Sequence, residues 1–135
     1  MKIKVVVDTN LFVAANYNPN SASAQIVNMI ARRDLIFIWS EAIAKEIRKI
    51  LDNAQVKDKF KKKVESKILR PEHCVEPRIS VKEVKDDPDD NKFLEAALEG
   101  DADYIITSDQ HLLKLGKFQD IPIFSPSNFW KVIKG

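Results

Sequence analysis

The chain has 135 residues, of which 44% are hydrophobic and 31% charged, and its net charge is +2. This length suits one domain, residues 1–135, with a core of its own. No apolar run reaches the roughly 18 residues that a membrane span needs, and the N-terminus turns acidic too early for a signal peptide. The single cysteine, Cys74, cannot form an internal disulfide, which fits a reducing cytoplasm, and zinc-type spacing is absent.

Charge is distributed unevenly along the chain. Residues 57–70 carry seven basic and two acidic side chains, whereas residues 83–103 carry nine acidic and two basic ones. The first segment can hold a polyanion, and the second requires cations to offset its self-repulsion.

The hydrophobic patterns predict alternating strands and helices. In chain order, the first elements are a strand at 2–8, a helix at 21–34, a strand at 34–40, a helix at 40–51 that Ser40 opens, and an amphipathic helix at 54–69. A short strand within 74–81, which Pro77 limits to a sheet edge, precedes a helix at 87–100, strands at 103–107 and 121–124, and a closing helix at 125–133. The uninterrupted Val5–Val7 run is typical of a strand buried on both faces. The alternation predicts an α/β sandwich around a mostly parallel sheet.

Two aspartates lie just past apolar strands. Asp8 follows the first strand, and Asp109 follows the strand at 103–107. A charge at the end of an apolar strand needs a partner or a metal. The alternative for each is a cap of the helix that comes next.

Glu46 lies on the predicted helix at 40–51. It borders the apolar stripe of that helix, whereas Glu41 points away from it. Glu46 is therefore the glutamate that can reach inward. The alternative is a surface glutamate paired with Lys45 or Lys49.

Four aspartates crowd into residues 86–90, divided by Pro88. Asp87 is the natural N-cap, because proline fits the first helical position. Asp90 then shares the buried stripe of the helix, whereas Asp89 lies about 100° away. We predict Asp90 to be the functional acid, Asp87 the cap, and Asp86 and Asp89 solvent-facing charges; Asp90 completing a capping box is the alternative.

Strand ends and the starts of the following helices share one rim of a parallel sheet. Four carboxylates that meet there repel one another unless cations neutralise them. Ligands that are all oxygen favour Mg²⁺ or Mn²⁺ over zinc, and such sites typically perform phosphoryl chemistry.

The stretches "VVVDTNLFVAA", "SEAIAKEI", "DPDDNKFLEAAL" and "ADYIITSDQHLLKL" resemble the PIN domain, in the form found in VapC-like toxins of type II toxin–antitoxin systems. The resemblance runs from about residue 3 to residue 130. It implies a three-layer α/β/α fold and a Mg²⁺- or Mn²⁺-dependent ribonuclease, a homodimer with a cognate antitoxin protein as partner.

The family pattern implies that the acids are Asp8, Glu46, Asp90 and Asp109. We expect the three aspartates to bind one metal directly and Glu46 to complete the shell through water or a second metal. Supporting positions are Asn10, Thr107 and Ser108, the last standing where relatives often have glycine.

Two alternatives stay open. Lys61, Lys62 and Lys63 can hold the RNA backbone, or they can be the solvated face of an amphipathic helix. The fold can also serve as a catalytically silent RNA-binding or protein-interaction module, although the intact acids favour an enzyme.

Overall fold

A computed structural model describes residues 2–84 and 88–134 of the chain. Its centre is a sheet in the order β2-β1-β3-β5-β4. The strands are β1 (Ile3–Val7), β2 (Leu35–Phe37), β3 (Tyr104–Ile106), β4 (Lys117–Phe118) and β5 (Ile121–Phe124). β1 runs parallel to β2 and β3, β3 runs parallel to β5, and the short β4 is antiparallel to β5. The predicted mostly parallel sheet is confirmed.

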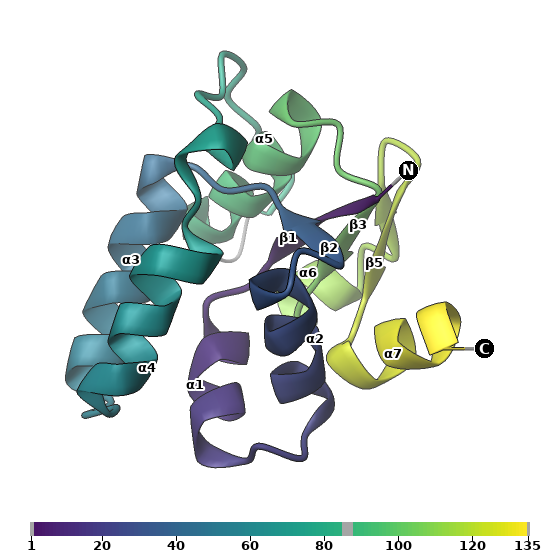
Figure 1. Cartoon of the computed structure of the whole chain (residues 1–135). Helices are drawn as coiled ribbons and strands as arrows, with labels where there is room; N and C mark the ends of the chain where they lie inside the picture. The colour runs from purple at the N-terminus through teal and green to yellow at the C-terminus, as the bar shows by residue number, and fades with distance from the viewer. Residues whose placement is uncertain (1, 85–87, 135) are drawn as a thin grey trace.

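Helices cover both faces of this sheet (Figure 1), with α5 on one side and α2 and α7 on the other. They are α1 (Asn10–Tyr17), α2 (Ala22–Ala31), α3 (Glu41–Asn53), α4 (Asp58–Lys63), α5 (Asn91–Glu99), α6 (Gln110–Leu113) and α7 (Pro126–Lys134). The α/β/α sandwich is therefore confirmed. No helix of the described part is long and apolar enough to cross a membrane.

The core forms where the apolar patterns predicted it. Val5, Val6 and Val7 are fully buried, since helices pack on both faces of β1. Ser40 caps α3 by accepting a hydrogen bond from the Ile43 N–H at 3.4 Å. α5 ends at Gly100 as expected.

Two local predictions were wrong. The helix expected at 54–69 divides into α4 and a π-helical turn at Val64–Ile68. The strand expected within 74–81 is reduced to a single bridge between Trp39 and Cys74. Helices α1 and α6 were considered only as the helices that Asp8 and Asp109 could cap, and strand β4 was not predicted. A two-residue strand such as β4 is too short to show a hydrophobic period, so the sequence does not predict it without its partner strand.

Candidate active site

The site lies at the carboxyl ends of β1 and β3, two neighbouring strands inside the sheet. From β1 the chain crosses to β2 on one side, and later returns to β3 on the other. Ligands of open α/β sheets bind at such a reversal of strand order, beyond the carboxyl ends. Val7 pairs with Ile106, so the residues that follow them, Asp8 and Thr107, emerge side by side.

Asp8 is a buried carboxylate held by two neutral donors. Its side chain is 5% exposed. Oδ2 accepts a hydrogen bond from the Thr107 hydroxyl at 2.6 Å, and Oδ1 accepts one from the Asn10 N–H at 3.1 Å. The second bond satisfies the N–H of the first residue of α1, whose N-cap position is Thr9, so the capping alternative describes part of what Asp8 does. The side chain of Asn10 itself is exposed.

Burial raises the pKa of Asp8, and the two hydrogen bonds oppose that rise. The negative charges of Asp109 and Glu46 raise the pKa further. Asp109 and Glu46 therefore both lie close enough to Asp8 to repel its charge.

Asp109 follows β3 and caps α6. Its Oδ1 accepts the His111 N–H at 2.7 Å, and its own N–H donates to Thr107 Oγ1 at 3.0 Å. One buried hydroxyl thus links Asp8 to Asp109. Ser108, between Thr107 and Asp109, has an exposed side chain.

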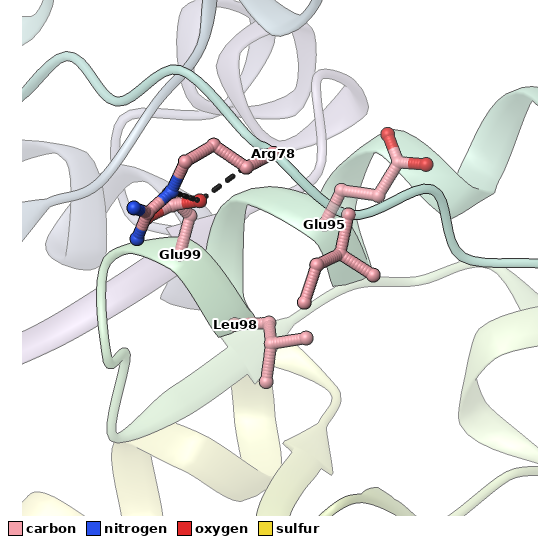
Figure 2. Close-up of a pocket in the computed structure, with 5 residues that line it drawn as sticks. Arg78, Glu95, Leu98 and Glu99 are labelled. Atoms are coloured by element: carbon pink, nitrogen blue, oxygen red, sulfur yellow. Dashed lines mark hydrogen bonds and ion pairs between the residues drawn. The ribbon is translucent and has the colours of Figure 1, made fainter.

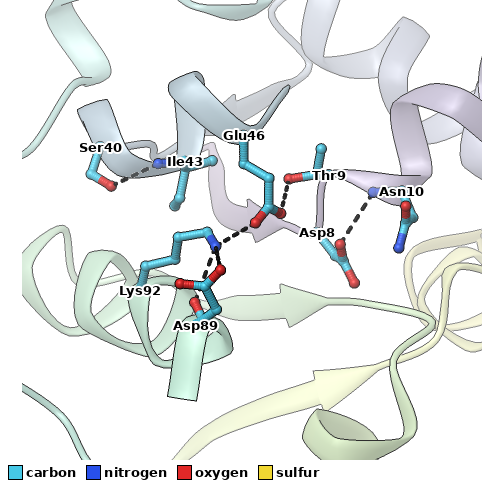
Figure 3. A network of polar contacts seen from close by, with 8 residues as sticks. All are labelled: Asp8, Thr9, Asn10, Ser40, Ile43, Glu46, Asp89 and Lys92. Atoms are coloured by element: carbon cyan, nitrogen blue, oxygen red, sulfur yellow. Dashed lines mark hydrogen bonds and ion pairs between the residues drawn. The ribbon is translucent and has the colours of Figure 1, made fainter. Parts of the chain in front are cut away.

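Glu46 points from α3 toward the residue after Asp8 (Figure 3). Its Oε1 accepts a hydrogen bond from the Thr9 hydroxyl at 2.7 Å, and its Oε2 forms an ion pair with the Lys92 ammonium. The prediction that Glu46 reaches inward is confirmed, whereas a surface pair with Lys45 or Lys49 is not what the structure shows.

Asp90 lies in a 3-10 turn, Pro88–Asp90, that leads into α5. Its side chain is buried, at 8% exposed, whereas the side chain of Asp89 is 88% exposed. The predicted inward and outward directions of these two aspartates are confirmed. The cap predicted at Asp87, and the exposure predicted for Asp86, lie outside the described residues.

A family model described as "PIN domain" matches residues 4–111. The chain belongs to the PIN-domain family. It is also 33% identical over 131 residues to "Uncharacterized protein MJ1680" of Methanocaldococcus jannaschii, across 85% of this chain and 76% of that protein. The PIN match stops before β4, β5 and α7, yet Phe118, Ile123 and Phe129 from these elements are buried in the same core.

The donors around Asp8 fit a hard divalent cation, although the groups stand apart. Among residues 2–84 and 88–134, no three histidine, cysteine, aspartate or glutamate side chains are close enough to hold a metal ion as they lie. The donor set is all oxygen, the preference of Mg²⁺ and Mn²⁺. A cation beside Asp8 would also offset the burial and like-charge repulsion that raise its pKa.

Residues 78–84 form a strap along α5 that leads toward the acidic turn of this PIN domain. Figure 2 shows its first anchor, where Arg78 meets Glu99. Three side chains spaced four apart on α5 accept backbone N–H groups of the strap, in the pairs Arg78 with Glu99, Val81 with Glu95, and Val84 with Asn91, at 3.0, 2.9 and 2.8 Å. The strap thus fixes the path of the chain shortly before Asp90.

The predicted RNA-binding lysines point to two different places. Lys61 forms an ion pair with Asp52 at 3.0 Å. Lys62 and Lys63 instead line a groove of about 460 Å³, which we call the lysine groove. Its other lining residues are Asn16, Lys57, Lys59, Phe60, Ser66 and Lys67.

Sequence reasoning missed Lys92 and Thr9, the two partners of Glu46. Lys92 is two residues after Asp90, so a helical wheel places it about 200° away, on the opposite side. The available signal was the excess of acids in 83–103, which required a cation nearby.

Proposed function

We propose that this protein is a metal-dependent endoribonuclease of the PIN family, whose site is built on Asp8, Asp90 and Asp109. PIN domains are generally nucleases, and the chain belongs to that family. The observation that carries the proposal is Asp8: a buried carboxylate at the strand-order reversal, whose pKa is raised by burial and by two further acids. Such a group lowers fold stability at neutral pH, which favours a functional explanation.

The chain's own residues prepare the site. Thr107 and Asn10 hold Asp8 in one orientation, and Thr107 and His111 do the same for Asp109. Asp8, Asp90 and Asp109 would hold Mg²⁺ or Mn²⁺, which activates water and neutralises charge on a phosphodiester. Burial keeps competing water away from Asp8 and strengthens its interaction with a cation.

The activity is tested on purified protein with RNA and Mn²⁺. We expect cleavage, and we expect Asp8→Asn and Asp90→Asn to abolish it. Asp89→Asn is the matched control, because it removes the same charge one position away from an exposed side chain. Loss of activity in the Asp89 variant alone would mean that the wrong aspartate was assigned. An intact protein that binds RNA without cleaving it would instead be the silent module.

We further propose that the RNA backbone lies along the lysine groove. Burial lowers the pKa of Lys63, and the charges of Lys67 and Arg32 lower it further. A phosphate would relieve this crowding of cations. Phe60, at the wall of the groove, offers an apolar surface between the lysines.

RNA binding with EDTA present separates this step from cleavage. Lys62→Ala with Lys67→Ala should reduce the slope of log affinity against log salt by about 1.4, since each single-strand phosphate contact contributes about 0.7. Lys61→Ala with Lys131→Ala is the control, because it removes two positive charges that lie outside the groove. This pair should change the slope of log affinity against log salt much less. Equal slopes for the two pairs would contradict the groove.

The family context adds a role as the toxin of a toxin–antitoxin pair in the cytoplasm, with a single PIN domain over residues 1–135 that acts as a homodimer. The continuous core that joins β5 and α7 to the matched region supports the single domain. Expression should arrest growth, and Asp8→Asn should relieve the arrest. Light scattering on the purified protein reports the oligomer.

A further inference from the structure

Lys92 places a positive charge beside Glu46 and Asp89. It is the second residue of α5, and its side chain is 12% exposed. The ammonium donates to Glu46 Oε2 and to the Asp89 carbonyl oxygen at 3.1 Å, and it lies 5.1 Å from the centre of the Phe93 ring. These contacts hold the charge in one place (Figure 3).

Glu46 is engaged on both oxygens. Thr9 donates to one oxygen, and Lys92 pairs with the other. Thr9 directly follows Asp8, and Asp89 directly precedes Asp90, so this set of contacts connects two of the three proposed metal-binding aspartates. The charge of Glu46 is thus already neutralised by the chain itself.

A second divalent ion at Glu46 would have to displace or closely approach the ammonium. Like charges a few ångströms apart in a partly buried site repel strongly. Two-metal sites use their second ion to stabilise charge on the reacting phosphate. A fixed ammonium supplies positive charge at the same edge of the site without a second ion.

We propose that Lys92 takes the place of a second cation, so that the site binds one divalent ion through Asp8, Asp90 and Asp109. Glu46 is then a positioning residue, which holds Lys92 in place and does not ligate the metal. This inference rests on the proposed metal-dependent function.

The test is Mn²⁺ binding to the full chain, followed by the electron paramagnetic resonance signal of free Mn²⁺, with no RNA present. The wild type should bind one ion, and Asp8→Asn should lose it. Lys92→Met removes the cation and frees Glu46, so it should bind a second ion or bind the first tighter by on the order of tenfold or more. Lys92→Gln, which keeps a donor for Glu46, is measured beside it, in case the methionine variant does not fold.

The decisive comparison is the charge-balanced double variant, Glu46→Gln with Lys92→Met. If Glu46 holds only Lys92, the double variant binds one ion with close to wild-type affinity. Two ions in the wild type, or loss of the ion in a folded double variant, would make Glu46 a ligand and overturn the inference. Unchanged stoichiometry and affinity in both folded Lys92 variants would also overturn it. A wild type that binds no Mn²⁺, or binds it independently of Asp8, refutes the proposed metal site itself.

Discussion

The Thr107 hydroxyl forms hydrogen bonds with two acidic residues of the site. It donates to Asp8 at 2.6 Å and accepts the Asp109 N–H at 3.0 Å, and the residue is fully buried. Thr107→Val keeps the shape of the side chain and removes this hydroxyl. Because the bond to Thr107 lowers the pKa of Asp8, that pKa should rise further in the valine variant.

The magnitude follows from the two bonds. A hydrogen bond to a charged group contributes about 2 kcal/mol, and the Asp109 N–H left without its acceptor costs about 1 kcal/mol more, so the free energy of unfolding should fall by about 3 kcal/mol. Thr107→Ser keeps both bonds and loses one methyl group, worth about 1 kcal/mol. Thr107→Val should therefore cost about 2 kcal/mol more than Thr107→Ser, and its own cost of about 3 kcal/mol is the contribution of the two bonds of the hydroxyl.

Urea unfolding at pH 7 measures these values for both Thr107 variants. Thr107→Val and Thr107→Ser are then measured in the Asp8→Asn protein. There the Thr107 hydroxyl no longer bonds to a charged group, so Thr107→Val should lower the free energy of unfolding by less than it does in the wild type. We also expect Mn²⁺ to bind the valine variant more weakly than the serine variant. A valine variant within about 0.5 kcal/mol of the wild type, or a serine variant as destabilised as the valine variant, would contradict the role assigned to the hydroxyl.

Three further predictions concern stability. Asp8→Asn should raise the free energy of unfolding at pH 7: since folding raises the pKa of Asp8 above 3.8, the wild type loses stability as pH rises from about 3.8 through the raised pKa. Melting temperatures across pH should therefore show the gain at neutrality and none near pH 3, and an asparagine variant less stable at pH 7 would contradict the assigned cause. Asn91→Ala removes the partner of both the N–H and the carbonyl of Val84, at 2.8 and 3.2 Å, and should cost about 2–4 kcal/mol with faster amide exchange at Val84; slow exchange at that amide would show that the strap stays in place without Asn91. Gly100→Ala sets a methyl group 2.4 Å from Ile38 Cγ2 and should cost about 1–3 kcal/mol in thermal unfolding. That cost should shrink when Ile38 is alanine in both proteins, and an undiminished cost would mean that the contact is not its cause.

The positions of the acids could be predicted because each depends on a local pattern. Asp8 follows an apolar run whose burial fixes where the strand ends, and the stripes of α3 and α5 turn Glu46 and Asp90 inward. The structure places all three as expected. Asp8 and Asp90 are buried, and Glu46 points from α3 to Thr9 at the end of β1. The end of the sheet at which these acids lie followed from chain order alone.

The partners of those acids could not be predicted, because they depend on how distant elements pack. Lys92 reaches Glu46 across 46 positions in sequence. Glu46 pairs with Lys92, and not with Lys45 or Lys49, because α5 packs close to α3. The sequence of neither helix alone predicts that packing. The segment 74–81 failed as a strand for the same reason: side chains of α5 accept its N–H groups, so it needs no neighbouring strand.

These partners also determine how the site forms. Thr107 and Asn10 satisfy Asp8, His111 satisfies Asp109, and Thr9 and Lys92 satisfy Glu46. Each of these three carboxylates thus has a donor from the chain, so the fold does not need a metal to hold Asp8, Asp109 and Glu46 in place. A metal then stabilises the protein by mass action alone, by an amount set by its concentration relative to Kd. The near-ultraviolet circular dichroism spectrum should therefore be the same in EDTA and in Mn²⁺, while the melting temperature rises with Mn²⁺ in the wild type and stays flat in Asp8→Asn. A spectrum that collapses in EDTA would show that the donors supplied by the chain are not sufficient.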